Sequence, residues 1–107
     1  MPLANVKISP EREDAKSIYY AEWLAIGLHF TQSVSATGDW LIKPEGATHL
    51  MLQSIDANIR YTIDESRATL THGFQLAQGA ISPISCPLRG ISVFREGVTA
   101  IQGQWVK

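Results

Sequence analysis

Hydrophobic and polar residues alternate with a period of two along much of this chain. The clearest example is residues 59–64, IRYTID, in which Ile, Tyr and Ile alternate with Arg, Thr and Asp. Successive side chains of a β-strand point to opposite faces, so this period predicts a strand with one apolar face. Leu50 and Leu52 follow the same period and predict a second strand over residues 47–54.

A shorter strand is predicted at residues 39–43, where Trp40 and Ile42 alternate with charged residues. Pro44-Glu45-Gly46 follows at once, and these residue types end a strand as a turn. We expect the runs over residues 47–54 and 59–64, which follow this turn, to form successive antiparallel strands.

Short apolar runs and turn signals also alternate in the second half of the chain. A loop rich in Ser, Thr and charge is expected from Asp64 to Gly73. Pro83 and Pro87 lack a backbone donor, which confines their run to a sheet edge or to irregular structure. The apolar runs in this half cover residues 74–76, 81–88, 91–95 and 98–106.

Residues 17–30 fit two periods. Six of seven alternate positions from Ile18 to Phe30 are apolar, which predicts a strand that only Glu22 interrupts. A helical stripe through Tyr19 and Trp23 is the alternative, and Ser9-Pro10 would be a suitable start for such a helix. We favour the strand because its alternation is the longer pattern.

Together these patterns predict an all-β fold. Seven to eight short strands with turn signals every eight to twelve residues are typical of an antiparallel β-sandwich, jelly-roll-like or immunoglobulin-like. A chain of 107 residues is the size of one domain, and we assign residues 17–107 to it.

Residues 1–16 differ from the rest, because six of these sixteen residues are charged and few are large hydrophobes. Such a segment has little to bury and predicts an extended polar N-terminal arm. The arm is either a frayed terminus or a segment that orders against a neighbouring subunit. Ile8 and Arg12 are its candidate interface residues.

Charge and composition exclude several classes of partner. Nine Lys and Arg against ten Asp and Glu leave no strong field for nucleic acid or an anionic membrane. Cys86 is the only cysteine, which fits a protein made in a reducing compartment. The sequence shows no signal peptide and no apolar run of about 18 residues, so we expect a soluble chain without a transmembrane segment.

No residue set predicts catalysis, a metal site or a cofactor. His29, His49 and His72 are about twenty residues apart, without the close spacing that puts two ligands on one element. Cys86 lies between Ser85 and Pro87, with no helix start or Gly-rich turn to activate a thiolate. We expect a protein that is not an enzyme. Arg60, on the outer face of a strand, is expected either in solvent or paired with an acid, for which Asp64 and Glu65 are the candidates.

The three tryptophans are the strongest candidates for a contact. At least two of them are expected in the core. Trp105 has little apolar company among Gln102, Gly103 and Gln104, so it is the one expected to reach an interface. Trp23 is the second candidate, and either ring could stack on a sugar.

One set of positions between Pro44 and Gly73 forms a recognisable pattern: Pro44-Glu45-Gly46-Ala47-Thr48-His49, Leu52-Gln53, Ile59-Arg60-Tyr61, Asp64, Thr69, Thr71 and Gly73, with Ile91–Arg95 and Trp105 further on. With this pattern the chain resembles a group of small proteins encoded by tailed bacteriophages and prophages. The resemblance covers about sixty residues. Glu65 and Ala68 stand where the group has glycine and proline, so we expect the loop to turn differently here.

The resemblance implies a virion protein, made in the host cytoplasm, that decorates or cements the capsid. Its partners would be the major capsid protein or another virion protein, and it would form a homo-oligomer, either a dimer or a trimer. A tail, collar or fibre adaptor is the first alternative. A glycan-binding β-sandwich module that uses Trp105 or Trp23 is the second.

Overall fold

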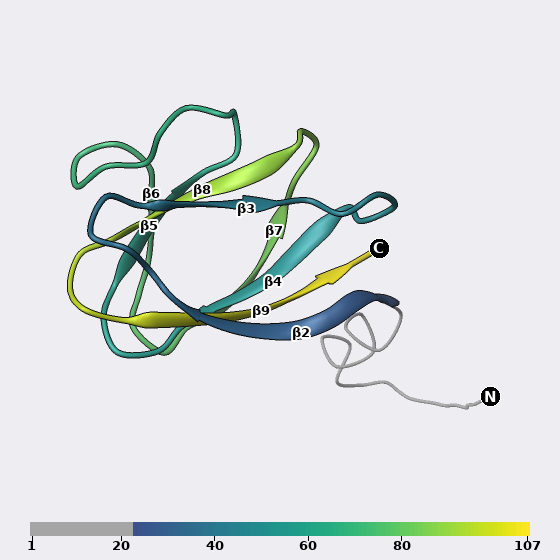
Figure 1. The fold of residues 1–107 in the computed structure, drawn as a ribbon, viewed down its shortest axis with the longest axis horizontal. Coiled ribbons are helices and arrows are strands. Elements are labelled where there is room, and N and C mark those ends of the chain that lie inside the picture. The colour runs from purple at the N-terminus through teal and green to yellow at the C-terminus, as the bar shows by residue number, and fades with distance from the viewer. Residues whose placement is uncertain (1–22) are drawn as a thin grey trace, which may run out of the picture.

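The computed structural model describes residues 23–107, and these fold as two packed antiparallel sheets without a helix (Figure 1). The eight strands are β2 (Ala25–Ser33), β3 (Asp39–Ile42), β4 (His49–Ser54), β5 (Ile59–Thr62), β6 (Phe74–Leu76), β7 (Ile81–Ser85), β8 (Gly90–Arg95) and β9 (Ala100–Val106). The predicted all-β sandwich is confirmed. The expected arm, with Ile8 and Arg12, lies outside the described residues, as does the start of the run over residues 17–30.

The strand order is that of a jelly roll. One sheet has the order β2-β9-β4-β7 and the other β3-β8-β5-β6. Only β5 and β6 are neighbours both in sequence and in a sheet, and every other connection crosses from one sheet to the other. Eight strands arranged in this way form a jelly roll, whereas an immunoglobulin-like sandwich places several sequence neighbours in one sheet.

This topology corrects the expected pairing of the two clearest strands. β4 and β5 follow each other in sequence, but they lie in opposite sheets and do not pair. The polar segment Asp56–Asn58 is therefore an arch between the sheets and not a hairpin turn. β4 pairs instead with β7 and β9, and β5 pairs with β6 and β8.

Strands β2 and β7 follow the sequence expectation. Residues 25–33 are extended, so the helical alternative for residues 17–30 is wrong where the structure describes them. β7 is an edge strand, as Pro83 within it predicted, and Pro87 lies beyond its end. Within residues 23–107 no helix is long and apolar enough to cross a membrane.

Trp105 lies in the core, which corrects its assignment to an interface. Ile101 and Trp105 share the inner face of β9 and are buried, and Trp105 is only 7% exposed. Gln102 and Gln104 occupy the outer face, because side chains alternate along the strand. These glutamines are Trp105's neighbours in sequence only, so they say nothing about its surroundings.

Arg60 forms a different ion pair from the expected one. Its Nε donates to the Glu96 carboxylate at 2.7 Å, and Glu96 lies just after β8, the strand that pairs with β5. Gln75 and Arg60 together lower the pKa of Glu96 through hydrogen bonds to its carboxylate. Asp64 and Glu65 lie beyond the end of β5 and make other contacts.

Candidate interaction surface

Strand β3 presents two large hydrophobic side chains to solvent. Its residues Trp40, Leu41 and Ile42 are all apolar, but only Leu41 faces the core. Trp40 is 47% exposed and Ile42 is 74% exposed. Adjacent exposed hydrophobic side chains form the kind of patch at which proteins contact a partner.

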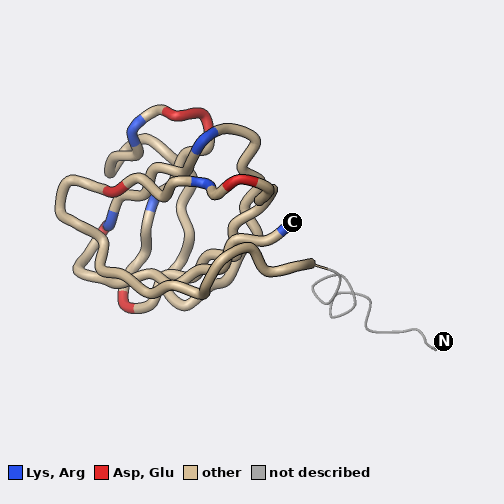
Figure 2. The backbone as a smooth tube through the Cα atoms, turned by 45° about the vertical axis from the view of Figure 1, so that its right-hand side comes forward, with Lys and Arg blue, Asp and Glu red and all other residues tan. Residues whose placement is uncertain are grey.

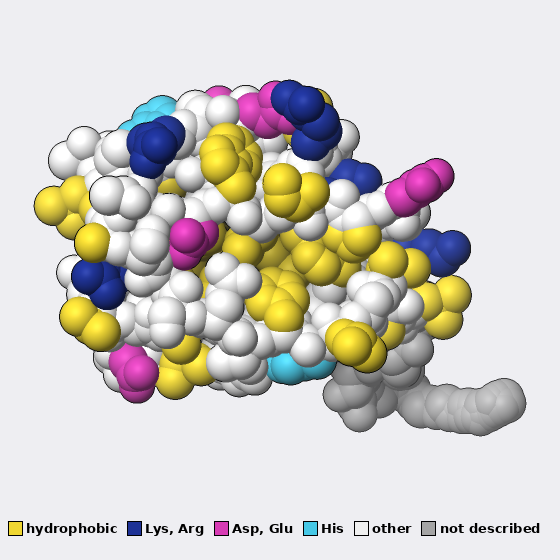
Figure 3. Space-filling view, viewed as in Figure 1, with side chains coloured by type: hydrophobic (Ala, Val, Ile, Leu, Met, Phe, Trp, Pro, Cys, Tyr) yellow, Lys and Arg dark blue, Asp and Glu magenta, His cyan; other side chains and the backbone are white. Residues whose placement is uncertain are grey.

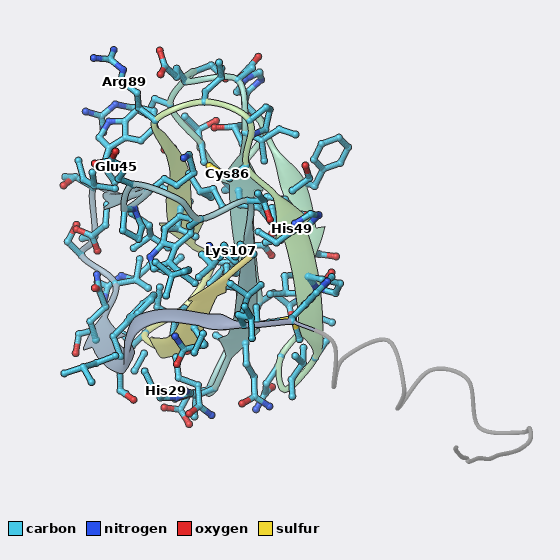
Figure 4. All side chains as sticks on the ribbon, turned by 90° about the vertical axis from the view of Figure 1, so that its right-hand side faces the viewer. His29, Glu45, His49, Cys86, Arg89 and Lys107 are labelled. Atoms are coloured by element: carbon cyan, nitrogen blue, oxygen red, sulfur yellow. The ribbon has the colours of Figure 1, made fainter. Side chains whose placement is uncertain are left out.

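A shallow hollow of about 410 Å³ lies against these two side chains. It is lined by Trp40, Ile42, Glu65, Arg89 and Gly90, which we call the β3 surface. Arg89 Nε donates to the Glu65 carboxylate at 3.2 Å. In Figure 4 the labelled Arg89 side chain points away from the sandwich. The surface thus combines an apolar centre with a charged rim.

Figures 2 and 3 show the setting of this surface. Acidic and basic positions lie side by side along the loops at the top of Figure 2, so no charge of one sign dominates there. In Figure 3 hydrophobic side chains gather on the face where β3 and β2, the edge strands of the two sheets, lie toward the viewer. This is the face on which the apolar side chains of β3 lie beside charged ones.

Glu65 brings its carboxylate to the rim through a left-handed backbone conformation. Its φ is 70°, a value that glycine adopts readily and other residues rarely do. We expected a different turn because glycine is absent here, yet the loop takes the positive φ without it. Hydrogen bonds from Arg89 lower the pKa of the Glu65 carboxyl group.

Two substitutions at Glu65 separate backbone strain from the ion pair. Glu65→Ala removes the contact with Arg89 and keeps the strain, whereas Glu65→Gly removes both. We expect Glu65→Gly to melt about 4 to 8 °C above Glu65→Ala, because a left-handed non-glycine residue is strained. Thermal unfolding followed by circular dichroism measures the difference. Equal melting temperatures would show that Glu65 is unstrained.

Ala68 anchors the same loop from inside. Its side chain is buried, and its backbone N–H donates to Ser92 Oγ on β8 at 3.0 Å. Proline at this position would have no N–H and could not make this bond. Alanine at position 68 therefore permits a buried hydrogen bond.

The loop also brings together a serine, a histidine and an aspartate. Ser66 Oγ lies 2.9 Å from His72 Nε2 and 2.5 Å from Asp64 Oδ1. In a hydrolytic triad the acid contacts the histidine, and the histidine accepts the serine proton. Here the carboxylate contacts the serine itself. The two hydrogen bonds from Ser66 lower the pKa of Asp64, which makes it a weaker base.

This arrangement stabilises the loop and does not activate a nucleophile. The backbone N–H of Ser66 also donates to Asp64, which closes a local Asx turn. With its proton directed at Asp64, the Ser66 hydroxyl accepts from His72. The hydrogen bonds among Asp64, Ser66 and His72 thus fix the conformation of the loop.

The remaining chemical candidates from the sequence lie apart. His29 contacts Gln102, His49 contacts Thr48, and His72 contacts Ser66. Figure 4 shows His29 and His49 well separated. No group of three potential ligands among residues 23–107 is arranged for a metal ion. Cys86 is buried, and desolvation raises the pKa of its thiol.

The tryptophans differ most from expectation. At least two were expected in the core, but among residues 23–107 only Trp105 belongs to the buried cluster. Trp23 is half-buried, and its ring stacks on His49 with centroids 5.1 Å apart. Its predicted role at an interface stays a prediction. Trp40, which the sequence did not single out, is the tryptophan most open to solvent.

Comparisons of the chain with family models, with curated proteins and with solved structures found no match.

Proposed function

We propose that this protein is a non-enzymatic structural component of a bacteriophage virion, and that it decorates or cements the capsid through protein-protein contacts. The observation that carries the proposal is the β3 surface. An aromatic side chain, an aliphatic one and a rim with an arginine have the composition of a protein contact, in which tryptophan and arginine dominate the binding energy.

The sequence resemblance supports the same proposal. Its signature residues serve the fold: Pro44 accepts from the N–H of Ala47 in a turn, and the following residues form β4, β5 and the loop after them. A signature made of turn and strand residues belongs to a structural protein more naturally than to an enzyme. Jelly rolls also recur in viral capsid proteins, although the fold alone does not imply the function.

Binding to isolated particles tests the proposal. Purified full-length protein is mixed with capsid shells, and separately with tails, of the phage or prophage that encodes it, and is then sedimented. We expect co-sedimentation with the shells, and weaker binding after deletion of residues 1–16 or after Trp40→Ala. Phe74→Ala, an exposed aromatic position on β6, is the matched control.

The outcomes separate the capsid role from the adaptor role, and a contact through residues 1–16 from one through the domain. Binding to tails alone would favour the adaptor alternative. Failure to bind either particle would overturn the virion proposal. If the deletion variant bound shells as tightly as the full chain while still folded by circular dichroism, the contact would lie on the domain and not on residues 1–16.

Glycan binding is the second candidate, and one observation favours it. The Trp40 ring is open to solvent next to Glu65 and Arg89, which offer an acceptor and donors for sugar hydroxyl groups. An aromatic platform with a few polar groups is the usual design of a small-ligand site. The relevant ring would be Trp40, and not Trp105, which is buried.

A glycan array and tryptophan fluorescence test this second candidate. A hit on the array, together with a fluorescence change that Trp40→Ala abolishes, would support it. An empty array with an unchanged spectrum would eliminate it.

A further inference from the structure

Within residues 23–107 the two sheets have four edge strands, and three of them carry features that hinder pairing with another chain. β2 carries an irregularity between Ile26 and Phe30, where Gly27 takes a φ of 76°. β7 contains Pro83, and β6 has only three residues. Bulges, prolines and short strands are the devices by which proteins prevent edge-to-edge association. β3 has neither a proline nor a bulge.

The backbone of β3 offers free hydrogen-bonding groups. Among residues 23–107, β3 pairs with β8 alone. The N–H of Lys43 donates to Arg89 on that side, and hydrogen-bonded positions alternate along an antiparallel strand. The backbone N–H and C=O groups of Leu41 and Asp39 therefore also point towards β8. By the same alternation the N–H and C=O groups of Trp40 and Ile42 point away from β8. Figure 1 shows where β3 lies in the sandwich.

We propose that β3 pairs with β3 of a second copy of this chain, antiparallel and centred on Leu41. In this register Trp40 lies opposite Ile42 of the second copy, and Ile42 lies opposite its Trp40. Each such pair exchanges two backbone hydrogen bonds, which uses all four outward groups of each strand. The result is one continuous eight-stranded sheet across a two-fold axis.

Side chains favour this register. Directly opposite residues of an antiparallel pair lie on the same face of the sheet, so the exposed Trp40 of each copy would cover the exposed Ile42 of the other. An aromatic residue opposite a β-branched one is a favourable cross-strand pair. The pairing thus covers Trp40 and Ile42, two of the large hydrophobic side chains that the monomer leaves in water.

The charges at the strand ends are also complementary. The register places Asp39 of each copy opposite Lys43 of the other. Within residues 23–107 neither side chain has an ion-pair partner in its own chain. Asp39 Oδ2 accepts the backbone N–H of Ser35, which holds the carboxylate at the start of β3. A shift of the register by two residues would lose both charge pairs.

The contact is small, so the association should depend on concentration. Specific interfaces usually bury about 800 Å² on each partner, and one short strand with two large side chains buries less. We expect a monomer–dimer equilibrium with a dissociation constant roughly between 1 μM and 1 mM. Sedimentation equilibrium of the full chain over this range measures it.

Two proline variants test whether the open edge of β3 forms the dimer. Ile42→Pro removes an outward N–H without touching the ladder to β8, so the domain should stay folded and the dimer should be lost. Ile81→Pro is the matched control: Ile81 lies on the β7 edge, is 61% exposed, and by the same alternation its N–H points away from β4. It should dimerise like the unaltered chain. Circular dichroism checks that both variants fold.

A mixing experiment tests the register. Copies with Lys43→Asp carry two acidic groups at the ends of β3, and copies with Asp39→Lys carry two basic groups. Each variant alone should dimerise about tenfold more weakly than the unaltered chain, because like charges would face each other. The mixture should form a heterodimer at least as strong as the original homodimer.

The outcomes separate this proposal from the proposed function. A chain that stays monomeric at about 1 mM, a dimer that Ile42→Pro leaves intact, or charge variants that do not associate on mixing would each overturn the pairing. The pairing rests on the same β3 surface as the proposed function and gives it a second copy of the chain as partner, so Trp40→Ala would weaken shell binding by separating the two copies. Purified protein without particles tests the pairing. A monomer that binds shells would therefore refute the pairing alone, and a dimer that binds no particle would refute the virion role alone.

Discussion

Trp105→Ala should destabilise the domain by about 3 to 5 kcal/mol, the usual cost of truncating a buried tryptophan. Trp105 lies on β9, a central strand of its sheet. It is opposite Ile26 on one neighbouring strand and Leu50 on the other. Its removal leaves a cavity between these strands that the remaining side chains cannot fill without distortion. Urea unfolding followed by fluorescence or circular dichroism measures the loss.

Trp40→Ala is the matched control for this prediction. Its ring is half-exposed, so its truncation should cost about 1 to 2 kcal/mol, clearly less than that of Trp105. The comparison should be made at low protein concentration, so that self-association does not contribute. If both variants lost the same stability, or if Trp105→Ala lost less than about 1 kcal/mol, Trp105 would not be part of the core.

Ser92→Ala should cost about 1 to 3 kcal/mol, because it leaves the buried N–H of Ala68 without an acceptor. The loop after β5 would lose its link to β8, and amide hydrogens of residues 64–73 should exchange faster. Denaturant unfolding measures the stability, and hydrogen exchange measures the loop.

Ser82→Ala on β7 is the control, since among residues 23–107 the Ser82 hydroxyl contacts only the neighbouring Pro83 carbonyl, at 3.5 Å. A second comparison uses Ala68→Pro, which removes the donor. In that background Ser92→Ala should lower the free energy of unfolding by less than it does alone, since residue 68 has no N–H left without an acceptor. An equal cost in both backgrounds would contradict the role of this hydrogen bond.

Ser92 and Ala68 also affect the β3 surface. Ser92 lies opposite Trp40 in the ladder between β3 and β8, and through Ala68 it holds the loop that carries Glu65. Loosening this loop should therefore weaken any contact that uses the Glu65–Arg89 pair. A stable core and a fixed loop together keep the surface in one shape before a partner binds, which reduces the entropy lost on binding.

Most of the strands could be predicted from sequence. The period of two at residues 47–54 and 59–64, the turn residues between runs, and the proline of β7 identified elements that the structure contains. They could do so because strand geometry and proline chemistry act over a few neighbouring residues. The sheet to which each strand belongs was not predictable in this way, since β4 and β5 separate into different sheets.

The candidate surface was largely hidden from sequence reasoning. Trp40, Leu41 and Ile42 are all apolar, so alternation shows that they form a strand without showing which face is buried. Trp105 was misplaced because its sequence neighbours are polar, although its spatial neighbours are Ile26 and Leu50. The partner of Arg60 was missed because Glu96 is 36 residues away in the chain.

The sequence by itself determined an all-β chain with short strands, one edge strand marked by proline, and no closely spaced metal or catalytic motif. Only the tertiary structure decided that Trp105 is inside, that Trp40 and Ile42 are outside, and that β3 is the edge without protection. The physical reason is that period and turn chemistry are local properties of the backbone. Burial and edge position depend on which sheet packs against which.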